Sequence, residues 1–365
     1  MDLRNSFRDP QLAGRILDRL HHRMSGRVAR PRILIMEVCG THTVAVSRAG
    51  LRNLLPQGIT LISGPGCPVC VTDEAEIDHM IALARIPGVI LATYGDMMRV
   101  PGSTTNLLEE KAAGADVRLV YSALDAVELA ARNPAREVVF LGVGFETTAP
   151  VAALAVREAA RQGLANFSLF SAHKLTPPAM RALMADPTVR IDAFLCPGHV
   201  STILGEDGFA FLARERGMPA AIAGFEPLDI LRAVEVLVEQ VLEGQASLFN
   251  GYRRAVRAEG NPLAREVMSR CFEATPARWR GLGEIPASGL KLRPEYEPFD
   301  AEKRFSLPQS PARVKAGCRC GEVLKGKLDP RECPLFARGC DPTRPVGPCM
   351  VSTEGACAAY YQYER

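Results

Sequence analysis

The number and spacing of the cysteines in this chain indicate that their thiols could do chemistry. The 365 residues include eleven cysteines, three of them early, at Cys39, Cys67 and Cys70, and six of them between Cys318 and Cys357. The sequence holds no long apolar segment that would direct the chain into or across a membrane, so we expect a cytoplasmic protein. Because the cytoplasm is reducing, clustered cysteines there more often bind metal or do redox chemistry than form structural disulfides.

The C-terminal cysteines have a spacing that predicts a metal site. The six are Cys318, Cys320, Cys333, Cys340, Cys349 and Cys357. Apolar runs are few in this region, so a bound metal could supply the missing folding energy. A structural zinc needs four thiolates but favours two Cys-x-x-Cys pairs, and this region contains none. Six cysteines could instead provide four ligands to an iron–sulfur cluster and leave two as a redox-active pair, and spacing alone leaves both alternatives open.

The segment Cys67-Pro-Val-Cys70 lies at the end of a predicted strand and leads into a helix predicted over 73–85. A thiol near a helix N-terminus has a lowered pKa, so more of it is the nucleophilic thiolate. This pattern favours thioredoxin-like thiol exchange. The alternative is half of a zinc site or two inert thiols.

Cys39 follows a predicted buried strand, and His42 comes three residues later. A thiolate suits low-spin iron or copper, and the imidazole could act as a proton donor, a second ligand or an orienting partner. A lone cysteine after a strand is more often a small core residue, and we interpret Cys196 and Cys271 in that way. Three cysteines at the ends of neighbouring strands nevertheless favour a site at Cys39.

The elements that must position these residues alternate between strand and helix patterns. Helical stretches over 73–85, 124–132, 150–162 and 228–243 separate the strands, which is typical of parallel sheets covered by helices. The first four strands recur about 105 residues later, which predicts two similar α/β domains with four-stranded parallel sheets, over 31–122 and 123–249. The eight predicted strands begin near residues 32, 59, 88, 117, 138, 166, 192 and 219.

Two further features complete the prediction. From about residue 250 the sequence is irregular and rich in Pro and Gly, so we expect a smaller, partly helical third domain over 250–365, ordered by the metal that its cysteines bind. The 44 Lys and Arg against 41 Asp and Glu leave a net charge of +3. This excess is too small to argue for nucleic acid or an acidic membrane surface, and we expect neither partner.

Several longer motifs resemble the HypD family, whose members act in the assembly of [NiFe]-hydrogenases. The resemblance runs nearly from end to end of the chain. Its segments are MEVCGTHT (36–43), GPGCPVC (64–70), YGDMMRVPG (94–102), GFETTAP (144–150), PGHVS (197–201), GFEPLDIL (224–231), WRGLG (279–283) and CMVSTEGAC (349–357).

The resemblance implies a role for each group of cysteines. It implies that Cys39 holds iron with His42 as a helper, and that Cys67 and Cys70 form a thiol pair beside it. Cys320 and Cys349 match a redox pair next to a cluster, similar to the site of ferredoxin:thioredoxin reductase. The implied ligands of a [4Fe-4S] cluster are Cys318, Cys333, Cys340 and Cys357. The family also implies that the N-terminal helix, within residues 1–30, packs with the third domain.

The function implied by the resemblance is an assembly scaffold. On it the Fe(CN)2CO moiety of the hydrogenase active site would be built jointly with a small partner, HypC, while HypE and HypF deliver cyanide. Electrons would pass from the [4Fe-4S] cluster through cysteine thiols, so redox activity in cofactor biosynthesis accompanies the scaffold role and leaves open whether the protein is an enzyme. The alternative is a [4Fe-4S]-dependent thiol–disulfide oxidoreductase acting on another substrate. A third reading is a purely structural zinc site.

Overall fold

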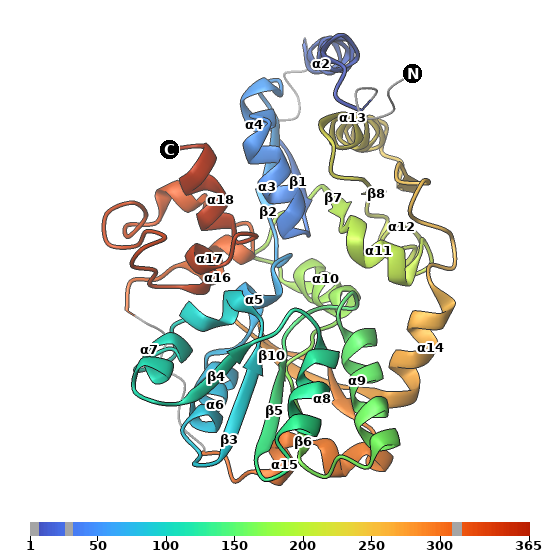
Figure 1. Ribbon diagram of the computed structural model, residues 1–365. Helices are drawn as coiled ribbons and strands as arrows, with labels where there is room; N and C mark the ends of the chain where they lie inside the picture. Colours follow the sequence, from blue (N-terminus) through green and yellow to red (C-terminus); the bar gives the residue numbers. More distant parts are fainter. Residues whose placement is uncertain (1–6, 26–31, 309–315) are drawn as a thin grey trace.

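Two parallel β-sheets form the frame of the computed structural model, which describes residues 7–25, 32–308 and 316–365 (Figure 1). All eight predicted strands form, and a short ninth strand extends the first sheet. The prediction of an α/β fold with two parallel sheets flanked by helices is confirmed. The first sheet has the order β2 (Ile59–Ser63), β1 (Ile33–Glu37), β7 (Ala193–Cys196), β8 (Ala220–Ile222), β9 (Leu248–Asn250). The second has the order β4 (Asp116–Leu119), β3 (Val89–Thr93), β5 (Glu137–Gly142), β6 (Phe167–Ser171).

The strands are shared between the sheets differently from the prediction. The first sheet pairs β1 with β7, in a register that sets Ile35 opposite Ala193, and the whole second sheet lies between them in sequence. The predicted division into 31–122 and 123–249 is therefore wrong, because β3 pairs with β4 and β5 and not with β1 or β2. The regular spacing located the strands, but pairing depends on packing between distant segments. Both sheets nevertheless begin in the same way: β2 and β4 are edge strands, and β1 and β3, which precede them in the sequence, lie inside the sheets.

Helices cover both faces of the sheets and create three hydrophobic clusters. One lies on the face of the first sheet under α13 (Pro227–Glu243) and contains Ile33 and Ile35. A second lies on the far face of the second sheet under α8 (Ala123–Arg132) and α9 (Ala149–Gln162). The largest contains Met36 of the first sheet and Leu91 of the second, together with side chains of α6 (Glu74–Ala84) and α10 (Thr176–Ala185). One continuous core therefore joins the two sheets.

The N-terminal helix α2 (Pro10–Met24) packs against α13, at the top of Figure 1, with Asp9 as its N-cap. Its buried Ile16 and Leu20 belong to the cluster of the first sheet. Arg19 also pairs with Glu235 of α13, at 2.5 Å between Nε and Oε1. The expectation that this helix packs with the third domain is wrong, because its apolar stripe and its arginines match α13.

The predicted third domain is divided in the structure. Helix α14 (Pro262–Cys271) packs on α9. The hairpin of β10 (Phe272–Trp279) and β11 (Gly283–Leu292) is a separate antiparallel sheet that packs on α10, so both lie beside the second sheet. The part after residue 316 is a separate cysteine-rich segment at the left of Figure 1, and its last helix, α18 (Ala356–Tyr363), packs on α3 (Gly40–Arg48). The other helices of that segment are α16 (Cys320–Leu324), η3 (Pro330–Glu332) and α17 (Pro348–Val351).

The remaining short helices connect these parts. They are α4 (Leu51–Leu54), α5 (Pro68–Val71), η1 (Gly95–Arg99), α7 (Leu107–Ala112), α11 (Gly198–Leu204), α12 (Phe211–Arg216), η2 (Pro294–Phe299) and α15 (Ala301–Arg304). Among the described residues, the helices are all too short or too polar to span a bilayer.

Candidate functional site: thiols at the junction of the sheets

Cys39 follows β1 and stands at the N-cap position of α3, without a capping hydrogen bond from its side chain. Its side chain is 7% exposed. The loop after β2 presses directly on it, since a Cβ placed on Gly66 would lie 2.2 Å from the backbone nitrogen of Cys39. The Gly40 N–H also donates to the Gly66 carbonyl at 3.0 Å. Only glycine at position 66 allows this approach, which sets Cys39 beside the segment that carries Cys67.

The surroundings of Cys39 keep its thiol protonated. Burial raises the pKa of the Cys39 thiol to about 12, and the nearby Glu354 carboxylate adds to the rise. The backbone N–H groups of His42 and Thr41 act in the opposite direction and favour the thiolate. Glu354 is fixed by the Thr41 hydroxyl, which donates to its carboxylate at 2.6 Å. A metal ion bound to this sulfur would displace the proton.

His42 is fully buried and neutral. Its Nε2 lies 3.0 Å from the Gly224 carbonyl oxygen and 3.2 Å from that of Ala223, so Nε2 carries the hydrogen. Nδ1 therefore keeps a lone pair, which has no hydrogen-bond partner within the described parts of the chain. Burial lowers the pKa of His42 to about 4. At neutral pH this side chain can accept a proton or bind a metal, but it holds no proton at Nδ1 to give.

Cys67 and Cys70 form a disulfide across α5, with their Cα atoms 5.2 Å apart. Cys67 is 3% exposed and Cys70 is fully buried, so the disulfide is shielded from small thiols dissolved in the solvent. The Cys70 Sγ lies 3.9 Å from the carbonyl oxygen of Pro348, the residue directly before Cys349. The predicted helix over 73–85 is confirmed as α6, which begins after a capping box between Asp73 and Glu76.

All six C-terminal cysteines line one pocket. Cys320, Cys340 and Cys349 are buried, and the other three are partly exposed. The rest of the wall is mostly apolar. The pocket is lined by Cys318, Cys320, Val323, Cys333, Leu335, Phe336, Cys340, Gly347, Cys349, Met350 and Cys357.

The details of this pocket fit an iron–sulfur cluster. The Val346 N–H donates to the Cys340 Sγ at 3.2 Å, the kind of bond that tunes cluster ligands. A Cβ on Gly347 would lie 2.6 Å from the Cys318 Sγ, so glycine keeps this side of the pocket open. In the described residues, His, Cys, Asp and Glu do not converge in threes on a single ion position. Six thiols on an otherwise apolar wall are donors that an iron–sulfur cluster or a zinc ion would both accept.

The cysteine-rich segment touches the carboxyl ends of both sheets. Beyond β1, it reaches Thr41 through Glu354. Beyond β3, the Ser352 hydroxyl donates to Asp96 at 3.0 Å. Cys67 and Cys70 lie in the same hydrophobic cluster as Cys320 and Cys349. Helix α5, which contains Cys70, contacts α17, which contains Cys349.

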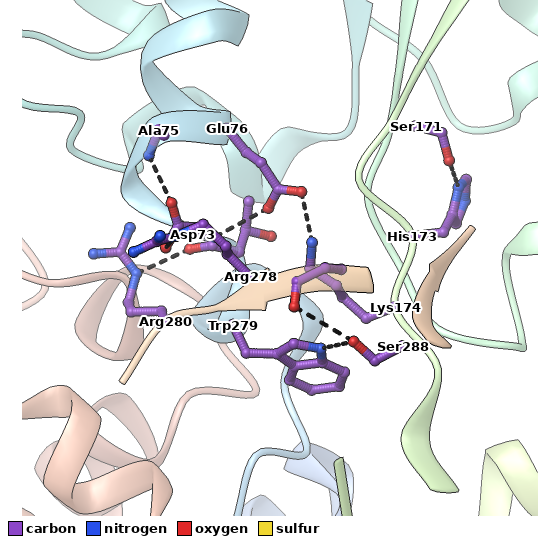
Figure 2. A network of polar contacts seen from close by, with 12 residues as sticks. Asp73, Ala75, Glu76, Ser171, His173, Lys174, Arg278, Trp279, Arg280 and Ser288 are labelled. Carbon is purple, nitrogen blue, oxygen red and sulfur yellow. Dashed lines mark hydrogen bonds and ion pairs between the residues drawn. The ribbon is translucent and has the colours of Figure 1, made fainter. Parts of the chain in front are cut away.

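A network of buried charges holds α6, which follows the Cys67–Cys70 segment, against the β10–β11 hairpin (Figure 2). Lys174 is 1% exposed and donates to Glu76 of α6 at 2.5 Å. From the hairpin, Arg280 pairs with Glu74, and the Trp279 indole N–H donates to the Ser288 hydroxyl at 2.8 Å. These contacts fix the position of α5 and its disulfide.

Sequence reasoning missed three residues of the site. Gly66, Glu354 and Arg280 stand within motifs that had been noted, but their types gave no reason to single them out. Each acts through a contact with a distant segment, and such contacts have no local pattern. Cys196 and Cys271 are buried free thiols in the sheet cores, as their packing interpretation expects.

The fold and the site together define an α/β protein with two parallel sheets, in which the segments carrying three groups of cysteines contact one another. The family model "HypD: Hydrogenase formation hypA family" matches residues 11–364. The chain is 48% identical to the hydrogenase maturation factor HypD of Rhodobacter capsulatus, over all of this chain and 98% of the relative. It is 45% identical to that of Escherichia coli K12, over 99% and 98% of the two chains, and 49% identical to that of Azotobacter vinelandii, over 91% and 89%. The chain belongs to the HypD family of hydrogenase maturation factors.

Proposed function

We propose that this protein is the scaffold on which the Fe(CN)2CO moiety of [NiFe]-hydrogenase is assembled, jointly with HypC. The observation that carries the proposal is that the three segments carrying the thiol groups contact one another. Gly66 sets Cys39 beside Cys67, and Pro348 sets Cys349 beside Cys70. An iron carrier that needs electrons requires this arrangement, and a protein with one structural metal does not.

Cys39 would hold the iron substrate while its ligands are added. Its thiolate is a soft donor that suits low-spin iron, and its burial protects the iron from water. The Nδ1 lone pair of neutral His42 is a second donor on the first turn of the same helix. HypC would share the iron, and HypE and HypF would deliver cyanide, in the cytoplasm, where all four proteins can meet.

The pocket would hold a [4Fe-4S] cluster on Cys318, Cys333, Cys340 and Cys357, and when bound this cluster supplies single electrons to neighbouring sulfurs. Cys320 and Cys349 then form the adjacent dithiol. The Cys349 thiolate would attack Cys70, and Cys67 would leave as a thiolate. Cys320 would then attack Cys349 of this mixed disulfide and release Cys70 as a thiolate. Two electrons and two protons pass to the Cys67–Cys70 pair, and no other reactant is needed for this exchange.

The test is infrared spectroscopy of anaerobically purified protein in complex with HypC. Cys39→Ala should remove the cyanide and carbonyl bands of bound iron. Cys271→Ala is the matched control, because it removes a buried thiol from the core of the second sheet and should leave the bands unchanged. Full band intensity in Cys39→Ala would refute Cys39 as the iron ligand.

The alternative is a thiol–disulfide oxidoreductase that never binds low-spin iron. It is favoured by the burial of both thiol pairs in one cluster, which alone would suffice for electron transfer. It predicts full redox cycling of Cys67 and Cys70 without HypC and no infrared bands in its presence. Anaerobic visible absorption separates both proposals from a structural zinc site, which would leave the protein colourless.

A further inference from the structure

Arg280 is a buried cation with an unused donor. It lies in the turn between β10 and β11 and is 6% exposed. Its Nε donates to the Thr72 carbonyl at 3.0 Å, and its Nη1 pairs with Glu74. Its Nη2 has no hydrogen-bond partner among residues 7–25, 32–308 and 316–365. An unpaired N–H of a buried guanidinium is costly, so a further role at this position accounts for it.

The turn that carries Arg280 lies directly against the cysteine pocket. Gly281 has a φ of +77°, and a Cβ placed on it would lie 2.3 Å from the Cα of Gly321, the residue after Cys320. In Figure 2 the Arg280 guanidinium points away from Trp279 and Lys174, to the side where the pale red ribbon of the C-terminal segment lies.

We propose that Arg280 raises the reduction potential of the cluster held in this pocket, with Glu74 partly offsetting its charge. The inference rests on the proposed function, because it requires the [4Fe-4S] cluster. An added electron increases the negative charge among the sulfurs, and a cation at a buried, low-dielectric position stabilises that state. Arg280 would not bind the cluster itself; it would act as a positioning residue, through the positive charge that it holds next to the sulfur ligands.

A purely structural role makes a different prediction. Arg280 also ties the first turn of α6 to the hairpin, so both Arg280→Met and Glu74→Gln loosen the same contact. If structure alone mattered, both variants would shift the potential in the same direction or not at all. If charge matters, the shifts have opposite signs, because a guanidinium stays protonated after its carboxylate partner is removed.

The experiment is a redox titration of the full-length protein with its cluster, followed by electron paramagnetic resonance. Arg280→Met should lower the ratio of reduced to oxidised cluster at least tenfold at a fixed potential, a shift of about 59 mV for one electron. Glu74→Gln should shift the reduction potential in the opposite direction, and the potential of Arg280→Lys should stay close to that of the wild type. Arg278→Ala is the control, because Arg278 is two residues away and 66% exposed.

Each result separates the two proposals. Equal potentials in all variants, or shifts of the same sign in Arg280→Met and Glu74→Gln, would overturn the role of Arg280 and leave the cluster proposal standing. Wild-type protein that binds neither iron nor sulfide would overturn the cluster proposal itself. If Arg280→Met fails to fold, Glu74→Gln alone decides the sign.

Discussion

Gly66→Ala is expected to separate Cys39 from the neighbouring thiol pair without removing a reactive group. The added Cβ would lie 2.2 Å from the backbone nitrogen of Cys39 and 2.4 Å from its Cα. Ordinary contact begins at 3.4 Å, so the two loops must move apart by more than 1 Å, and both atoms belong to backbone that cannot rotate away. Misplacement of a reacting group by about 1 Å costs on the order of 100-fold in rate. We therefore expect the infrared bands of bound iron to fall to a few per cent at equal assembly times.

The control for this substitution is Gly95→Ala, at the first residue of η1 after β3. A Cβ on Gly95 meets nothing within 4 Å, so the same chemical change there leaves the backbone in place. Both variants are followed by thermal unfolding, which identifies any general loss of fold. Band intensity in Gly66→Ala equal to that of Gly95→Ala would refute the conclusion that this backbone contact positions Cys39.

Three more predictions concern buried charges and the cysteine pocket. Burial raises the pKa of Glu146 from 4.5 to about 7, so its contribution to stability is full below pH 4.5 and is lost as the pH rises through 7. Urea unfolding should show that the free energy of unfolding falls by about 3 kcal/mol over this pH range, and that Glu146→Gln largely abolishes the fall. A variant with the pH profile of the wild type would contradict this role of Glu146. Arg52→Met leaves the fully buried Glu37 without its ion-pair partner and should lower the free energy of unfolding by about 3–5 kcal/mol. A loss below about 1 kcal/mol would show that the ion pair is dispensable. Cys333→Ser should lower bound iron and visible absorption, and retention of both would exclude Cys333 as a cluster ligand.

The strand positions could be predicted because burial leaves a local signature. Strands β3 and β6 are buried at every residue, so their apolar runs stand out in the sequence. Their partition into sheets could not be predicted, because β1 meets β7 only through tertiary packing. β9 was missed because it has three residues and only one of them is buried.

The candidate site divides in a similar way. Cysteine spacing predicted which residues could do chemistry, and the structure brings all six C-terminal sulfurs to one pocket. The spacing contained no information on the approach of Pro348 to Cys70, which joins segments 278 residues apart. The N-terminal helix was misplaced for a related reason, since its apolar stripe and the charge of Arg19 match α13 and Glu235, which lie more than 200 residues away in the sequence.

The discontinuous first sheet also has a consequence for how the protein forms. While the chain is synthesised, β1 and β2 emerge early, but the inner partner β7 follows only after the whole second sheet has been made. The second sheet consists of four successive strands, so its strand pairs join segments that are close in the sequence, and we expect it to fold first. The loops that carry Cys39 and the Cys67–Cys70 pair then stay incomplete until β7 is in place and the final cysteines arrive. If the proposed function holds, iron would therefore meet its binding site only after the cysteine-rich segment has been made.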